Sequence, residues 1–92
     1  LMKIYLKKFG NILTSRQDGR EAFGAINPDL INMGENEKIE IDFEGIGTLT
    51  PSWADEFITK IEDKYGKRVV LMATNNLSVK ATLQLLQRIK KL

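Results

Sequence analysis

Residues 39–57, with the sequence IEIDFEGIGTLTPSWADEF, decide the fold of this chain and carry its clearest functional signal. The stretch predicts a strand that passes through a glycine-containing turn into the start of a helix. Ser52 falls in the first turn of that helix, where we expect free backbone N–H groups and the positive end of the helix dipole to converge. A hydroxyl in this place is well situated to accept or lose a phosphate.

Residue types in and after this stretch define the strand and the helix. Apolar residues at positions 39, 41 and 43 alternate with polar ones, which is the period of a half-buried strand. Thr50 followed by Pro51 has the pattern of a helix N-cap with proline at the first helical position. Before Gly66 ends the helix, an apolar stripe is formed by Ala54, Phe57, Ile58, Ile61 and Tyr65.

Upstream of this unit, the pattern predicts another strand and another helix. Residues 2–6 alternate between apolar and polar positions, which indicates a strand near a sheet edge. Because proline disfavours helical geometry in the residue before it, we expect the helix that follows to kink or restart at Pro28. Thr14 or Ser15 can cap this helix, and its apolar stripe consists of Gly19, Ala22, Phe23 and Ile26.

Downstream, the pattern predicts one more strand and one more helix. Residues 67–73 become continuously apolar after two charges, which indicates a central strand covered on both faces. Strands that alternate with helices indicate an α/β domain with β-α-β-α-β-α order, a mainly parallel mixed sheet and helices packed on it. We therefore predict that residues 39–43 and 69–73 are adjacent parallel strands. Ser78 can cap the last helix, whose expected buried face is Val79, Thr82, Leu83, Leu86 and Ile89.

Length and composition limit the kind of protein. A chain of 92 residues with 42% hydrophobic content suits one domain over residues 2–92 with a single core, and Met2 is the expected native start. The net charge of +2 is too small to argue by itself for nucleic acid or an anionic membrane. No apolar run approaches the roughly 20 residues needed to cross a bilayer, and no export signal is visible. We expect a cytoplasmic protein without membrane contact.

Several kinds of chemistry are disfavoured by the residues present. The chain has no Cys and no His, so it lacks thiol nucleophiles, thiolate metal sites and the commonest general base and metal ligand. The acidic pairs Asp55/Glu56 and Glu62/Asp63 fall on the polar side of the predicted helix, where no cleft would raise a pKa. The glycine-containing turn lacks the third glycine of a dinucleotide-binding motif. We expect a protein that is not an enzyme and needs no cofactor and no metal.

The segment from Ile41 to Ala54 resembles the strand–turn–helix signature of STAS domains, the fold of anti-sigma-factor antagonists. In particular it is similar to the STAS-like domain family of unknown function. In the antagonists the strand ends in Asp-Leu-Ser-x-Val, and a later Asp-Ser-Ser-Gly opens the helix, its second Ser being phosphorylated by a partner kinase. Here residues 42–46 match the first motif and Ser52 falls at the phosphoacceptor, while Thr50, Pro51 and Trp53 depart from the second motif.

The resemblance implies a non-catalytic module that switches between protein partners in bacterial signalling. The implied partner is an ATPase of the histidine-kinase-like fold that acts as a Ser kinase. The expected contact region is Asp42, Thr50, Ser52 and Trp53, with Trp53 on the shoulder of the helix beside Ser52 as an aromatic anchor. Two alternatives stay open: Ser52 can simply help the helix to begin, and Trp53 can lie flat over a neighbouring loop.

A second hypothesis uses the last helix. Its basic side, formed by Lys80, Arg88, Lys90 and Lys91, would suit a small nucleic-acid-associated regulator. The ordinary charged face of an amphipathic helix explains the same residues, so we rank nucleic acid below a protein partner. A homodimer that buries Leu85 and Leu92 is compatible with either hypothesis.

Overall fold

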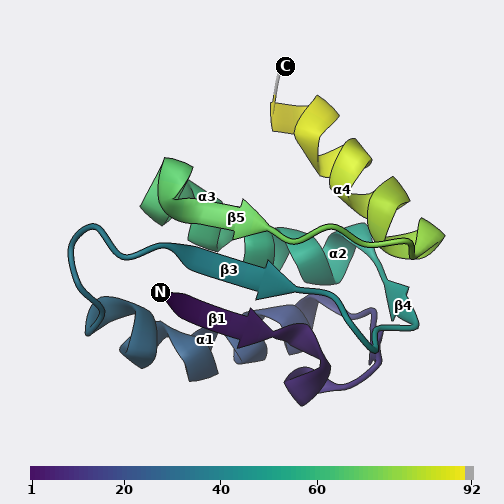
Figure 1. Ribbon diagram of the computed structural model, residues 1–92. Helices are drawn as coiled ribbons and strands as arrows, with labels where there is room; N and C mark the ends of the chain where they lie inside the picture. The colour runs from purple at the N-terminus through teal and green to yellow at the C-terminus, as the bar shows by residue number, and fades with distance from the viewer. Residues whose placement is uncertain (91–92) are drawn as a thin grey trace.

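The computed structural model describes residues 1–90 and contains a sheet of three parallel strands (Figure 1). The strands are β1 (Met2–Tyr5), β3 (Ile39–Asp42) and β5 (Val69–Leu71), in the spatial order β1-β3-β5. Ile41 pairs with Ile4 on one side and with Leu71 on the other. The predicted α/β class with a mainly parallel sheet and the predicted adjacency of β3 and β5 are both confirmed.

A second, very short sheet was not predicted from the sequence. It consists of two parallel strands, β2 (Ile12–Leu13) and β4 (Thr48–Leu49). One turn of 3₁₀ helix, η1 (Leu6–Phe9), connects β1 to β2. The backbone N–H of Thr50 donates to the carbonyl oxygen of Leu13 at 3.0 Å. The short sheet therefore fixes the residue that precedes the central helix.

Helix α1 (Arg16–Ile31) begins where the capping pattern predicts, because the Ser15 hydroxyl accepts a hydrogen bond from the backbone N–H of Asp18 at 3.0 Å. The predicted restart at Pro28 is wrong, since α1 continues through Pro28 to Ile31. Proline removes the hydrogen bond to the carbonyl four residues earlier, which belongs to the exposed Gly24. That carbonyl can be solvated, which lowers the cost of keeping Pro28 in the helix.

The central helical segment runs without interruption over residues 51–65 but is not one regular helix. It consists of α2 (Pro51–Ala54), the π-helical turn η2 (Asp55–Thr59) and α3 (Lys60–Tyr65). The predicted end at Gly66 is confirmed, since Gly66 has φ +54° and opens the 3₁₀ turn η3 (Gly66–Arg68) before β5. The π turn is absent from the sequence-based prediction.

The last helix, α4 (Leu77–Lys90), differs from its prediction at both ends. Its cap is Asn76, whose side-chain oxygen accepts from the Val79 N–H at 3.1 Å, so the predicted cap Ser78 is wrong. Ile89 is 56% exposed instead of buried, because the C-terminal end of α4 extends beyond the sheet (Figure 1). Lys91, predicted on the basic side of this helix, and Leu92, predicted in a homodimer contact, lie outside the described residues.

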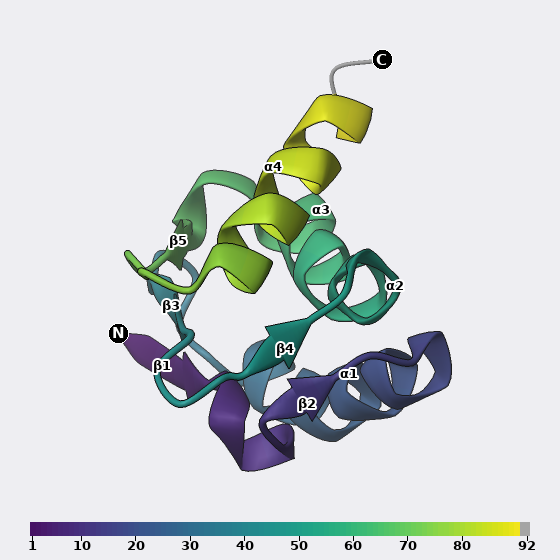
Figure 2. The same cartoon turned by 90° about the vertical axis from the view of Figure 1, so that its right-hand side faces the viewer.

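All four α-helices lie on one side of the three-stranded sheet (Figure 2). Side chains that point to this side, such as Ile4 and Ile41, are buried, whereas Tyr5 and Val70 on the other face are 42% and 39% exposed. The prediction that residues 67–73 form a central strand covered on both faces is therefore wrong, since β5 is an edge strand with one open face. No helix within residues 1–90 is both long and apolar enough to cross a membrane.

Candidate functional site

The turn after β3 places Asp42 at the end of the strand and on the open face of the sheet. One carboxylate oxygen of Asp42 accepts from the Glu44 N–H at 2.8 Å, and the other lies 3.5 Å from the Lys3 ammonium. Gly45 has φ +83°, a conformation that favours glycine, and it lets the chain reverse towards β4. Asp42 thus organises the turn that leads to the helix start.

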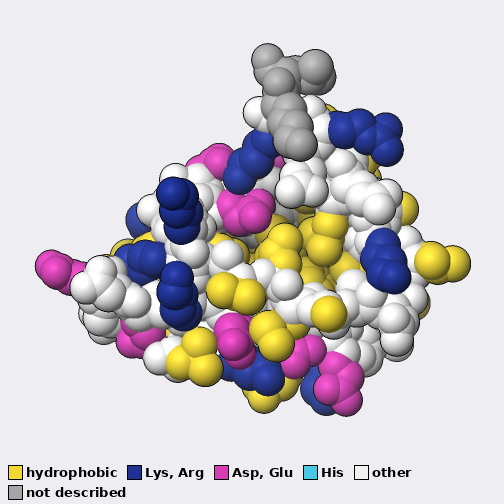
Figure 3. Space-filling view, turned by 45° about the horizontal axis from the view of Figure 1, so that its top comes forward, with side chains coloured by type: hydrophobic (Ala, Val, Ile, Leu, Met, Phe, Trp, Pro, Cys, Tyr) yellow, Lys and Arg dark blue, Asp and Glu magenta, His cyan; other side chains and the backbone are white. Residues whose placement is uncertain are grey.

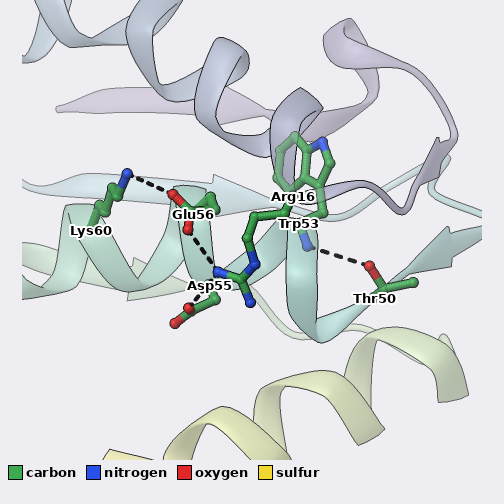
Figure 4. A network of polar contacts seen from close by, with 6 residues as sticks. All are labelled: Arg16, Thr50, Trp53, Asp55, Glu56 and Lys60. Carbon is green, nitrogen blue, oxygen red and sulfur yellow. Dashed lines mark hydrogen bonds and ion pairs between the residues drawn. The ribbon is translucent and has the colours of Figure 1, made fainter.

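Thr50 is the N-cap of the central helical segment, as its position before Pro51 predicts. Its hydroxyl oxygen accepts from the Trp53 N–H at 3.3 Å (Figure 4). The same hydroxyl donates to the carbonyl oxygen of Thr14 at 2.6 Å. The Ala54 N–H donates to the Thr50 carbonyl at 3.1 Å, and Pro51 has no N–H. Among the first helical N–H groups only that of Ser52 is left, so the expected convergence of several free N–H groups is wrong.

Ser52 occupies the second position of the helix and is half-buried. It keeps the location at the positive end of the helix dipole that the sequence predicts. Its hydroxyl is not needed as a cap, because Thr50 fills that role. Ser52 as a phosphoacceptor stays a prediction.

Trp53 does not lie on an exposed shoulder. It is only 1% exposed, with its ring centroid 4.9 Å from that of Phe57 and 6.1 Å from that of Phe9. The expected role of Trp53 as an exposed partner anchor is therefore wrong. The alternative, a ring lying flat over a neighbouring loop, is met in part, since the ring packs against Phe9 of η1 but at an interplanar angle of 51°.

Two features explain the burial of Trp53. A π turn holds more residues than an α turn, so it rotates the residues after it back by up to about 100° and brings Trp53 into line with Ile58 and Ile61. In addition, α1 approaches very closely at Gly19, where a Cβ atom would lie 2.5 Å from the Trp53 carbonyl oxygen. The helical segment is consequently covered by α1 as well as by the sheet.

The start of α4 is tied to β4 by side-chain hydroxyls. The Ser78 hydroxyl oxygen accepts from the Leu49 N–H at 3.1 Å, and the Thr82 hydroxyl donates to the Leu49 carbonyl at 2.6 Å. The Asn76 side-chain amide donates to the Ile46 carbonyl at 2.6 Å. These contacts hold α4 beside the helix start, a juxtaposition that the sequence analysis did not foresee because it joins residues about thirty positions apart.

A depression of about 330 Å³ lies where β4, the start of α2 and α4 meet. Pro51, Ala81 and Leu85 give it apolar walls, and Leu85 is 40% exposed. Thr50 lines the same depression, whereas Asp42 lines another one together with Glu44 and residues 72–75. The structure thus brings Thr50 and Pro51 together with α4 and leaves Asp42 apart from them.

The acidic pair Asp55/Glu56 forms an ion-pair network that holds α1 against the central helical segment (Figure 4). Arg16 lies 3.0 Å from Asp55 and 2.7 Å from Glu56, and Lys60 lies 2.7 Å from the second oxygen of Glu56. Hydrogen bonds from Lys60 and Arg16 lower the pKa of Glu56 below its usual value. A carboxylate held ionised in this way is a structural group rather than a proton donor.

The basic side of α4 is partly neutralised by its neighbours. The Lys90 ammonium lies 3.5 Å from Glu62 and 3.8 Å from Asp63. Lys80 and Arg88 are exposed. Within residues 1–90 no cluster of acidic side chains is arranged to hold a metal ion.

Comparisons with known proteins identify a family. The model of a family described as a STAS-like domain of unknown function matches residues 18–79, from the first turn of α1 to the start of α4. The comparisons with curated proteins and with solved structures gave no match.

Proposed function

Because the chain belongs to the family of STAS-like domains of unknown function, we propose that it is a non-catalytic module that binds a protein partner. The contact region is the helix-start surface, which we define as Thr50, Pro51, Ser52 and Leu85. The observation that carries the proposal is the depression between α2 and α4, whose apolar walls include a partly exposed Leu85. Exposed apolar side chains beside polar ones are typical of interaction surfaces.

The proposed partner is an ATPase of the histidine-kinase-like fold that acts as a Ser kinase, in a partner-switching system. Support comes from the position of Ser52, which is half-buried and directly follows Pro51, a residue that lines the depression. A phosphate on Ser52 would add a charge of about −1.5 to −2 beside Pro51. The helix dipole would tolerate that charge, whereas burying it against an apolar partner surface would carry a desolvation cost. Phosphorylation would thereby change partner affinity and leave the fold intact.

The test has two steps, beginning with affinity capture from the source cell. We expect an ATPase of the histidine-kinase-like fold to be retained by the wild-type protein and lost with Leu85→Glu, which puts a charge into the depression. Ile31→Glu is the matched control, because Ile31 is 61% exposed at the end of α1, away from the depression. Retention of the same proteins by Leu85→Glu would show that the helix-start surface is not the interface.

The second step uses the captured ATPase in purified form. With ATP present, we expect phosphate on the wild-type protein and none on Ser52→Ala. Ser52→Asp should weaken binding by about tenfold, or 1.4 kcal/mol, without lowering the melting temperature. Equal binding by Ser52→Asp and wild type, or equal labelling of Ser52→Ala, would refute the phosphoacceptor role.

A further inference from the structure

The free edge of β5 is the feature that the proposed function does not use. Backbone groups alternate between the two sides of a strand, and the Met72 N–H donates to Ile41 of β3 at 2.9 Å. The N–H and C=O of Leu71 therefore point to the other side, where no strand lies in the described part of the chain. A row of backbone groups of this kind pairs readily with another strand.

An apolar groove of about 330 Å³ accompanies this edge. Its apolar lining consists of Ile58, Leu71 of β5, and Leu83 and Leu86 of α4. The polar side chains of Glu62, Gln87 and Lys90 complete the lining. The end of α4 extends past β5, so the groove lies next to the position of a further strand (Figure 1). Figure 3 views the molecule from this side and shows apolar side chains gathered between charged ones.

The two outer edges of the sheet differ in charge. Lys3 lies within β1, and a charged side chain within an edge strand is a common way to protect that edge from pairing. In contrast, residues 69–73 contain no charged side chain, although Lys67 and Arg68 directly precede them, and Val70 is 39% exposed. The β5 edge is therefore the one suited to accept a strand.

We propose that a second copy of this chain occupies the β5 edge, with the two β5 strands antiparallel about a two-fold axis. With Leu71 opposite Leu71 of the second copy, the two residues exchange their N–H and C=O groups. On each side the Ala73 N–H can then donate to the Val69 C=O of the second copy. The Val69 N–H stays bonded to the Gly66 carbonyl, so this outer pair forms one of its two possible hydrogen bonds. The register uses only the backbone groups that the fold leaves free.

Side chains in this register are complementary on both faces of the sheet. On the helix side, Leu71 of the second copy lies at the mouth of the apolar groove. On the open face, Val70 lies opposite Met72 of the second copy, an apolar cross-strand pair.

The first test uses engineered cysteines, which the chain lacks. Opposed residues of a hydrogen-bonded pair have Cα atoms about 5.5 Å apart, within the roughly 4.4–6.8 Å of a disulfide. The two residues at position 70 are diagonal cross-strand neighbours in this register, and such neighbours are roughly 7–8 Å apart. Under mild oxidation we expect Leu71→Cys to form a covalent dimer and the more exposed Val70→Cys to do so at least about tenfold more slowly. Equal or faster linking of Val70→Cys would overturn the register and the proposal.

The second test uses sedimentation of proteins without cysteine, so it holds even if Leu71→Cys folds poorly. We expect the wild-type dimer to have a dissociation constant below about 1 mM. Val70→Lys should raise this constant at least about tenfold. Tyr5→Lys is the matched control, because Tyr5 is equally exposed on the same face but lies on β1. A wild type that stays monomeric, or a dimer disrupted by Tyr5→Lys and not by Val70→Lys, would overturn the proposal.

Discussion

At the scale of single residues, Trp53 is predicted from the sequence to lie at the surface, but the structure places it in the core. Its ring packs against Phe9 and Phe57, and its backbone N–H completes the Thr50 cap. Removing it would leave a large cavity between α1 and the central helical segment. We therefore expect Trp53→Ala to lower the free energy of unfolding by about 3–5 kcal/mol, measured by urea denaturation.

The control for Trp53→Ala is its neighbour Ser52, which is half-buried and does not cap the helix. Ser52→Ala should change the free energy of unfolding by no more than about 0.5 kcal/mol. A Trp53→Ala protein as stable as Ser52→Ala would mean that the ring is not part of the core.

Glu56 gives a prediction about pH at the same scale. Its pKa in the folded protein is lowered by Lys60 and Arg16 from the ordinary value of 4.5. Because a lowered pKa means that folding favours the ionised form, the stabilisation is complete above the unfolded pKa and is lost as pH falls through the folded pKa. The difference in melting temperature between wild type and Glu56→Gln should therefore be largest near neutral pH and shrink below about pH 4. An equal difference in melting temperature at pH 7 and below about pH 4 would contradict this role of Glu56.

At the scale of elements, two glycines of α1 are expected to respond to the same substitution with opposite signs. A Cβ at Gly19 would lie 2.5 Å from the Trp53 carbonyl oxygen, whereas nothing lies within 4 Å of a Cβ at Gly24. Gly19→Ala should force α1 away and cost about 1–3 kcal/mol of unfolding free energy. Gly24→Ala should add about 0.5–1 kcal/mol, because alanine favours the helix. If thermal melts show that both variants shift the melting temperature in the same direction, the close packing of α1 at Gly19 is contradicted.

The same scale explains what the sequence could predict. Alternating residues in 39–43 and the adjacent Thr50 and Pro51 are local signals, and they correctly predicted β3 and the helix cap. Strands of two residues, such as β2 and β4, are too short to show a period. The π turn changes which residues of the helix share one face, and no residue type in the sequence signals it. For this reason a regular helical period places Trp53 on the wrong face. An apolar run cannot distinguish a central strand from an edge strand under a helix, so β5 was assigned to the wrong place.

At the scale of the whole molecule, the distribution of charge favours the protein-partner hypothesis over the nucleic-acid hypothesis. The net charge is only +2, and Lys90 is within ion-pair distance of Glu62 and Asp63. The described part of α4 therefore presents Lys80 and Arg88 as its remaining exposed cations, and so few phosphate contacts would give only weak binding.

We expect no specific binding to DNA or RNA at about 150 mM salt, where attraction between exposed charges is screened beyond roughly 8 Å. A mobility-shift assay with random and mixed-sequence duplexes checks this. Glu62→Gln with Asp63→Asn provides the positive comparison, because removing both acids frees Lys90 and raises the net charge, so any weak binding should increase. Tight, sequence-dependent retention of the wild-type protein at this salt concentration, lost on Lys80→Ala with Arg88→Ala, would reverse the ranking, since it would require α4 to read bases and not merely to carry charge.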